Sequence, residues 1–195
     1  NTSWDAYRFE VSAHRWVRLE NASRSWAIAN DATYGWDVTR HQNDRRGTWS
    51  QVRATLVKSA RFPDPDQDQG QHQWNFRIVP DASVLEAVAA GQQINLGERE
   101  VSGAPVDAPF SVSGAVVESV ALAPDRSGDL VIRLYEAEGG PSRVTFRAPK
   151  AGSVTACDLR YRPSESEPEL RGGQGEWSFD LSAFQITTLR VSFAK

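Results

Sequence analysis

The segment VVESVALAPDRSGDLVIRLYEA, residues 116–137, decides the fold class. Two apolar runs, 116–123 and 130–137, flank a short stretch that contains proline, glycine and two aspartates. Side chains in the second run alternate between two faces, and a period of two is that of a β-strand. Two such runs joined by turn-forming residues predict an antiparallel β-hairpin.

The same alternation recurs through most of the chain. Further strands are predicted at 7–19, 26–29, 36–38, 48–60, 74–78, 143–147, 154–159, 177–179 and 184–193. Residues 40–47, 92–109 and 163–175 are polar or rich in Gly and Pro and are predicted to be loops. Roughly ten strands with few helices are typical of an antiparallel β-sandwich. We expect one β-sandwich domain over residues 1–195, because all-β domains often reach this length.

One short helix is predicted at residues 83–91, SVLEAVAAG. Ser83 and Glu86 have the spacing of a capping box, in which each side chain hydrogen-bonds to the backbone of the other residue. Gly91 follows the apolar stretch and is expected to end the helix.

Composition limits the classes of partner. The hydrophobic fraction of 39% and the charged fraction of 24% are those of a soluble globular protein. No apolar run approaches the roughly 18 residues of a membrane-spanning helix. The net charge of −3, with cations scattered among anions, provides no basic face for nucleic acid. Neither a membrane nor a nucleic acid is an expected partner.

Cys157 is the one cysteine, so no intrachain disulfide can form and no thiolate cluster can bind zinc. It lies within an apolar run, which favours a packing role over a nucleophilic one. A single cysteine fits a reducing compartment such as the cytoplasm. The chain has no Met and opens without a signal peptide, so we expect a piece of a longer protein.

Residues 63–76, PDPDQDQGQHQWNF, combine polar side chains with the rigid prolines and a flexible glycine. Such a loop suits a binding surface, although a well-capped connection requires similar residues. Asp64, Asp66 and Asp68 match the first three acidic positions of a calcium loop, but Gln69 replaces its glycine and Asn75 its final glutamate. The three histidines lie in separate segments, and we predict neither a metal site nor a catalytic residue in this chain.

Seven tryptophans are many for a chain of this length. Their flat rings suit either a large core or a platform for sugar rings. The chain could therefore be a free-standing carbohydrate-binding module that uses tryptophans such as Trp36, Trp49 or Trp74.

Three stretches resemble the C-terminal β-domain of the glycoside hydrolase family 38 α-mannosidases, particularly bacterial members. They are HRWVRLENASRSWAIANDATYGWDV (14–38), PDPDQDQGQHQWNFRIVP (63–80), and DRSGDLVIRLYEAEGG (125–140) together with the closing FQITTLRV (184–191). Arg18 departs from the family pattern, which commonly has Asp at this position.

The resemblance implies a sandwich of the galactose-mutarotase-like, or supersandwich, type. It further implies that the whole enzyme is a retaining, exo-acting α-mannosidase that hydrolyses terminal α-mannosides with a divalent metal, usually zinc. The catalytic aspartates and metal ligands would lie in an N-terminal α/β-barrel domain absent from these residues, so this fragment alone would be inactive and hold no cofactor.

In this reading, the β-domain packs on its own catalytic domain and helps to complete the site for the α-mannoside. Two segments are candidates for the rim of that site or for the domain interface. Their residues are Asn30, Asp31 and Tyr34 in the first segment, and Asp64, Asp68, Gly70 and His72 in the second. The alternative is that these residues only fix the turns in which they lie.

Overall fold

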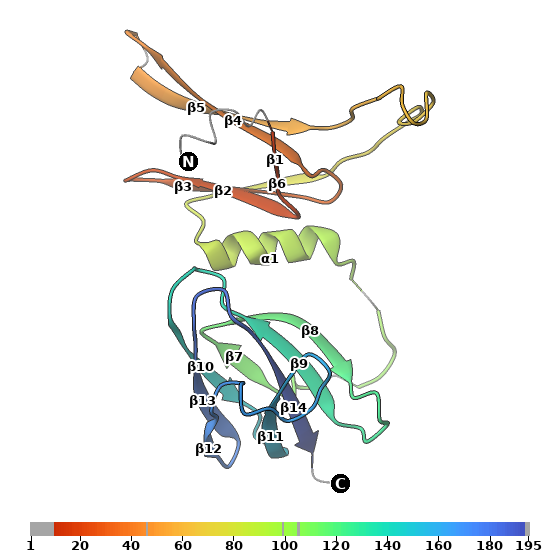
Figure 1. The fold of residues 1–195 in the computed structure, drawn as a ribbon, viewed down its shortest axis with the longest axis vertical. Helices are drawn as coiled ribbons and strands as arrows, with labels where there is room; N and C mark the ends of the chain where they lie inside the picture. The colour runs from red at the N-terminus through yellow and green to blue at the C-terminus, as the bar shows by residue number, and fades with distance from the viewer. Residues whose placement is uncertain (1–9, 46, 99, 105, 194–195) are drawn as a thin grey trace. The chain divides into compact units, whose positions relative to one another are not determined.

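The computed structural model describes residues 10–45, 47–98, 100–104 and 106–193. Within these ranges the chain forms fourteen β-strands and one α-helix (Figure 1). The paired strands are antiparallel throughout. This architecture confirms the predicted all-β antiparallel fold with one helix. No helix in the described ranges is long and apolar enough to cross a membrane.

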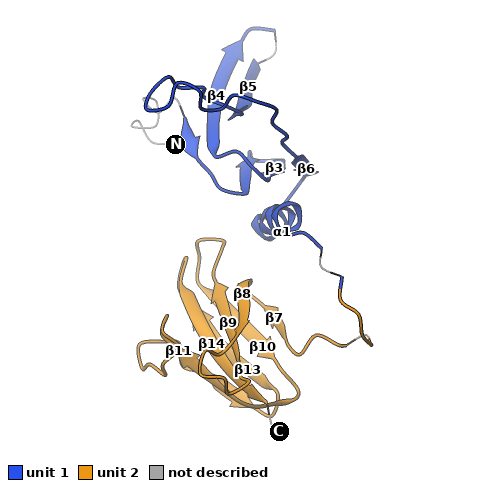
Figure 2. Cartoon of the chain, turned by 90° about the vertical axis from the view of Figure 1, so that its right-hand side faces the viewer, with its two compact units in different colours: residues 1–100 blue, residues 101–195 orange. Residues whose placement is uncertain are grey.

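The chain divides into two compact units, residues 1–100 and residues 101–195 (Figure 2). Each unit has its own group of buried apolar residues. The single β-sandwich domain expected over residues 1–195 stays a prediction. Val101 and Val106, which follow the helix and precede the first strand of the second unit, are each 90% exposed.

Unit 1 contains two three-stranded sheets (Figure 1). The first has the order β1 (Val11–Ser12), β4 (Gly35–Asn43), β5 (Gly47–Thr55), and the second has the order β2 (Trp16–Glu20), β3 (Ser25–Asn30), β6 (Phe76–Pro80). Three connections link the sheets: residues 13–15 between β1 and β2, a short turn at residues 31–34 between β3 and β4, and a long loop at residues 56–75 between β5 and β6.

Three predictions in unit 1 need correction. The strand predicted at residues 48–60 ends at Thr55. Residues 7–19 are predicted as one strand, but the described part breaks into β1 and β2 at residues 13–15, where Arg15 has a φ of 70°; residues 7–9 lie outside the described ranges. Residues 40–47 are predicted as a polar loop, but β4 runs to Asn43 and pairs there with β5, which begins at Gly47; residue 46 lies outside the described ranges. The hairpin is stabilised by cross-strand contacts of its polar side chains, including the stacked rings of His41 and Trp49.

The helix α1 (Val84–Asn95) begins where the sequence predicts. The predicted capping box is confirmed, because the Ser83 side chain accepts a hydrogen bond from the backbone N of Glu86, and the Glu86 carboxylate accepts one from the backbone N of Ser83. The predicted end at Gly91 is wrong, since the helix runs one turn further. A Cβ atom at position 91 would lie 3.0 Å from Cδ1 of Trp16, so this glycine permits close packing of α1 on β2.

Unit 2 is a sandwich of two four-stranded sheets. One sheet has the order β12 (Arg171–Gly173), β13 (Glu176–Leu181), β10 (Ser142–Arg147), β7 (Ser111–Ser113); the other has the order β11 (Ala151–Cys157), β14 (Ile186–Phe193), β9 (Leu130–Tyr135), β8 (Val116–Leu122). Inward side chains of both sheets share one core, which includes Ile132, Phe146, Phe179 and Leu189. The strands β8 and β9 form the hairpin predicted at residues 116–137.

The turn of this hairpin is fixed to β14 by Arg190. The Arg190 guanidinium donates to Asp129 at 2.6 Å and to Asp125 at 2.7 Å. The hydroxyl of Ser192 donates to the other carboxylate oxygen of Asp129 at 2.6 Å. Hydrogen bonds from Ser127, followed by those from Arg190, lower the pKa of Asp125 to about 2.

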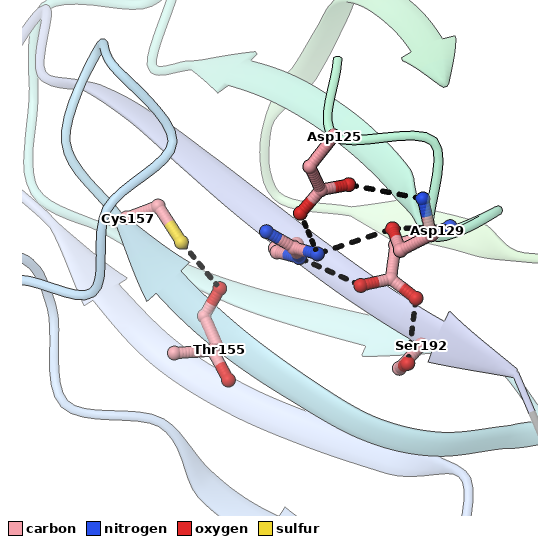
Figure 3. Close-up of polar contacts among 7 residues, drawn as sticks. Asp125, Asp129, Thr155, Cys157 and Ser192 are labelled. Atoms are coloured by element: carbon pink, nitrogen blue, oxygen red, sulfur yellow. Dashed lines mark hydrogen bonds and ion pairs between the residues drawn. The ribbon is translucent and has the colours of Figure 1, made fainter. Parts of the chain in front are cut away.

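Cys157 is 1% exposed at the end of β11. Its thiol lies 3.6 Å from the carbonyl oxygen of Thr155 (Figure 3). Burial raises the pKa of this thiol, which disfavours the reactive thiolate. The predicted burial of Cys157 in a strand is confirmed.

Candidate functional site

The first predicted segment, at residues 30–34, contacts the two ends of the loop that contains the second, at Thr55 and Asn75. The 31–34 turn is held at its start by Asn30, whose Oδ1 accepts hydrogen bonds from the backbone N of Ala32 at 3.2 Å and of Thr33 at 2.8 Å. The Asn30 carbonyl oxygen accepts a third hydrogen bond from Nδ2 of Asn95 at the end of α1, at 2.8 Å. Asn30 is 2% exposed, so it is a buried capping residue rather than a surface residue.

The turn holds both ends of the 56–75 loop. Thr33 donates its hydroxyl hydrogen bond to the carbonyl oxygen of Thr55, the last residue before the loop. Asp31 accepts hydrogen bonds from the backbone N of Asn75 at 3.0 Å and from its Nδ2 at 2.6 Å. We name residues 56–75 the clamped loop.

The Asp31 carboxylate is adapted to this contact. The hydrogen bond from the backbone of Asn75, followed by that from its side chain, lowers the pKa of Asp31 below its ordinary value. The charged form is therefore favoured, and it accepts both hydrogen bonds at neutral pH.

Tyr34 is the last residue of the turn, and its side chain is exposed. Its ring is 58% exposed and stacks on the His14 imidazole with a centroid distance of 5.3 Å and an interplanar angle of 18°. Its carbonyl oxygen accepts a hydrogen bond from the backbone N of Ala13 at 2.9 Å. The backbone fixes the position of Tyr34, while the side chain presents an aromatic face and a hydroxyl to the surface.

The clamped loop is organised by its own polar groups. Oδ1 of Asp64 accepts from the backbone N of Asp66 at 2.9 Å, and Oδ2 of Asp68 accepts from the backbone N of Ser59 at 3.0 Å. Nε2 of Gln67 donates to the Ala60 carbonyl oxygen at 2.6 Å. These contacts agree with the prediction of a loop with a fixed shape.

The end of the loop that approaches β6 is built around His72. Its Nε2 lies 3.0 Å from the carbonyl oxygen of Asp68, and its ring stacks on Trp74 with a centroid distance of 5.3 Å. The intervening backbone needs unusual angles, with φ of 61° at Asp68 and 127° at Gly70. The predicted role of Gly70 in permitting such an angle is confirmed.

Two of the acidic side chains in this loop already hydrogen-bond to its backbone. Asp64 and Asp68 each use a carboxylate oxygen to cap a backbone N–H. Across the described ranges, no three His, Cys, Asp or Glu side chains form a group that could hold a metal ion.

The predicted tryptophan platform is in part wrong. Trp36 is 2% exposed in the interior of unit 1, where its ring meets Phe76 edge-on, so it cannot stack on a sugar. Trp49 is 37% exposed but its ring is stacked on His41 at 4.2 Å.

Sequence reasoning missed the contacts that organise the site. Thr33, Thr55 and Asn75 clamp the loop, and Asp31 and Asn75 are 44 positions apart. The polar residue Asn75 directly before an apolar strand is the one available signal, and it does not identify its partner. Arg18, noted as a departure from the family pattern, donates to the Ala82 carbonyl oxygen at 2.6 Å and pairs with Glu20, and so supports the entry to α1.

Two family models match the chain, one in each unit. Residues 1–66 match the model of the glycosyl hydrolases family 38 C-terminal domain, and residues 114–189 match that of the glycosyl hydrolases family 38 C-terminal beta sandwich domain. The second match agrees with the sandwich of unit 2.

Curated relatives cover almost the whole chain. Alpha-mannosidase 2C1 of Homo sapiens is 34% identical over 205 residues, which span 97% of this chain and 18% of that protein. Alpha-mannosidase G of Dictyostelium discoideum is 28% identical over 97% of this chain and 18% of its own length, and alpha-mannosidase of Saccharomyces cerevisiae is 28% identical over 99% of this chain and 20% of its own length. The chain thus spans about a fifth of the length of these relatives.

The matches confirm the family resemblance, while the narrower likeness to bacterial members stays a prediction. Both models describe C-terminal domains, and together they reach into each compact unit. The chain therefore belongs to glycosyl hydrolase family 38, as a C-terminal β region of an α-mannosidase-like protein.

Proposed function

We propose that these 195 residues are the non-catalytic β region of a longer α-mannosidase, an enzyme that hydrolyses terminal α-mannosides. The names of the relatives support the substrate class, and their greater length supports a separate catalytic part. The retaining, exo-acting reaction belongs to the whole enzyme. This chain alone is then inactive.

The catalytic carboxylates and the divalent metal, usually zinc in such enzymes, belong in this proposal to an α/β-barrel domain outside these residues. The described residues do not fit a zinc site, because they contain no suitable group of metal ligands. Each histidine ring is instead stacked on an aromatic ring, with His14 on Tyr34, His41 on Trp49 and His72 on Trp74.

The clamped loop and the 31–34 turn form the part of this chain that meets the barrel and completes the wall of the sugar site. The observation that carries this role is the double attachment of the loop to the turn, through Thr33 and through Asp31. A loop held at both ends keeps its polar groups in place at low entropic cost, as positioning of a substrate requires.

Three groups in this region can contact a sugar. The Asp68 carboxylate can accept hydrogen bonds from sugar hydroxyls through the oxygen that does not cap Ser59, and the Tyr34 hydroxyl can donate or accept. His72 is oriented by the Asp68 carbonyl oxygen and by Trp74, which leaves Nδ1 as its second polar atom. Phe62, 86% exposed in the same loop, supplies an apolar contact for the barrel domain.

The test uses the complete polypeptide and an aryl α-mannoside. Tyr34→Phe and His72→Ala are compared with Gln71→Ala, a substitution at an exposed neighbour in the same loop. Loss of one sugar hydrogen bond is expected to raise KM about five- to tenfold at unchanged folding in Tyr34→Phe, and by at least as much in His72→Ala, which also loses the contacts of His72 with the Asp68 carbonyl oxygen and Trp74. Unchanged KM and kcat in both variants would contradict the contact with the sugar.

A further inference from the structure

A cleft of about 580 Å³ opens within unit 1, between the β2–β3–β6 sheet and the β4–β5 hairpin. Its lining is mainly apolar and includes Leu19, Trp26, Ile28 and Ile78 from the sheet and Val52 from the hairpin. Trp26 is 42% exposed and Ile78 is 64% exposed, so the large side chains of this cleft are only partly covered. An apolar, open cleft of this kind marks an interaction surface.

The β2–β3–β6 sheet is apolar on both faces. Along β3, Ala27 and Ala29 are fully buried, and Ala27 packs against Ala87 of α1. Trp26 and Ile28 alternate with them and therefore lie on the opposite face, which lines the cleft. A sheet that is apolar on both faces is typical of one that is covered on both faces. Here α1 covers one face, and the described residues leave the other partly open.

The hairpin beside the cleft has a free strand edge. β5 is the end strand of its sheet, so no described strand pairs with its outer edge over residues 47–55. A long, unpaired edge is a template for another extended segment. The cleft thus adjoins a strand that can accept backbone hydrogen bonds from a partner.

Three charged residues line the cleft: the exposed cations Arg24 and Arg40, and Glu20, whose carboxylate is paired with Arg18 at 2.7 Å. Neither the Arg24 nor the Arg40 guanidinium forms an ion pair with a described residue. By contrast, Arg53 of the same unit pairs with Asp37 at 2.9 Å. An occupant with an apolar centre and acidic ends would complement this lining.

We propose that the cleft receives an extended strand of the same polypeptide, from the part that lies outside these 195 residues. This strand pairs with the outer edge of β5, places alternate apolar side chains against Trp26, Ile28 and Ile78, and carries acidic residues near Arg24 and Arg40. The inference rests on the proposed function, in which this chain is one part of a longer α-mannosidase, as the 18% coverage of the human relative supports.

Hydrogen exchange tests the strand pairing directly. The amides of β5 that point away from β4 are compared between the purified 195-residue chain and the complete polypeptide. Pairing with an added strand is expected to slow their exchange at least about tenfold in the complete polypeptide. Acrylamide quenching of Trp26, obtained in each protein as the difference between the unsubstituted form and the Trp26→Phe variant, is expected to fall in parallel. Equal exchange and equal quenching in the two proteins would overturn the proposal.

A matched pair of substitutions tests the cleft itself. Ile78→Asp introduces a charge in the cleft, and Leu159→Asp introduces one at a position of similar exposure, 67%, in unit 2. Ile78→Asp is expected to leave the melting temperature of the 195-residue chain nearly unchanged and to lower that of the complete polypeptide, while Leu159→Asp has the smaller effect there. Equal melting shifts from the two substitutions in the complete polypeptide would contradict the proposal.

Other occupants give different results. Protection of Trp26 in a dimer of the 195-residue chain, seen by sedimentation, would assign the cleft to a second copy and overturn the proposal. Protection of Trp26 by mannose would assign the cleft to a sugar and also overturn it. A complete polypeptide that hydrolyses α-mannosides but leaves β5 unprotected refutes this inference alone, whereas protection of β5 without hydrolysis refutes the proposed function alone.

Discussion

Asp31 and Asn75 are joined by two hydrogen bonds that connect the β3–β4 turn to the end of the loop before β6. The Asp31 carboxylate accepts from the backbone N of Asn75 at 3.0 Å and from its Nδ2 at 2.6 Å. With the bond from Thr33 to the Thr55 carbonyl oxygen at the other end, this pair makes the turn and the clamped loop a single structural element.

Replacing Asp31 by Ala is expected to release one end of the loop. Loss of the two hydrogen bonds should lower the free energy of unfolding by about 1–2 kcal/mol, and the amides of residues 71–75 should exchange faster. Urea unfolding and hydrogen exchange measure the two effects. Asp66→Ala, which removes an exposed carboxylate of the same loop, is the control. Equal exchange in both variants would contradict the clamp.

The clamp should also weaken in acid. The folded-state pKa of Asp31 is lowered, so its contribution to stability is present above the unfolded-state pKa of about 3.9 and is lost as the pH falls through the folded-state pKa. Hydrogen-exchange rates of the amides in the clamped loop, corrected for intrinsic rates, are measured between pH 6 and pH 3 (roughly the range of carboxylate titration). They should therefore change less in the Asp31→Asn variant than in the unsubstituted chain.

Arg190 should make unit 2 sensitive to acid. The pKa of Asp125 is lowered to about 2, so its contribution to stability is complete above the unfolded-state value of about 3.9 and declines as the pH falls toward 2. Asp129, whose pKa is lowered by Ser192 and then by Arg190, acts in the same direction. Asp129→Asn should lower stability at neutral pH and reduce the loss in acid, as urea midpoints at several pH values would measure. Glu165→Gln, at an exposed position, should do neither.

Glu136 should be needed to hold the β9–β10 turn to the β13–β14 turn. Its carboxylate is buried and accepts hydrogen bonds from the backbone N of Glu138 at 2.6 Å, Gly139 at 2.9 Å and Phe184 at 2.9 Å. Glu136→Gln places an amide N–H₂ where N–H donors converge, so the urea midpoint should fall. Glu138→Gln, which keeps the backbone donor, is the matched control. Equal midpoints for the two variants would show that the charge at position 136 is dispensable.

Gly91 should tolerate no large side chain. A Cβ at this position would lie 3.0 Å from Cδ1 of Trp16 and 3.2 Å from Cβ of Arg15, so Gly91→Leu must separate α1 from β2. Such overpacking costs about 1–3 kcal/mol, measured by thermal or urea unfolding. Ala89→Leu, at an exposed position of the same helix, should be close to neutral. A Gly91→Leu variant as stable as Ala89→Leu would mean that the close contact is absent in solution.

Features encoded by neighbouring residues could be predicted from the sequence. The β8–β9 hairpin and the Ser83–Glu86 capping box depend on residues close together in the chain, and both are confirmed. The burial of Cys157 followed from the apolar run around it. Local patterns were therefore sufficient for the fold class and for the start of the helix.

Features that depend on contacts between distant residues could not be predicted. The hairpin at residues 40–47 is polar, and its strands are stabilised by each other rather than by an apolar pattern. Gly91 resembles a helix stop, but the helix continues to Asn95, and the close approach of Trp16 at this position depends on a residue distant in the sequence. The burial of Trp36 and the pairing of Asp31 with Asn75 likewise depend on how β3, β4 and β6 come together.

Hydrolysis of an aryl α-mannoside tests the central claim most directly, namely that this chain is the non-catalytic β region of an α-mannosidase. The purified 195-residue chain and the complete polypeptide are assayed side by side with zinc present. We expect turnover by the complete polypeptide and none by the 195-residue chain. The claim would be contradicted if α-mannosidase activity co-purified with the 195-residue chain and persisted after contaminating enzymes were removed.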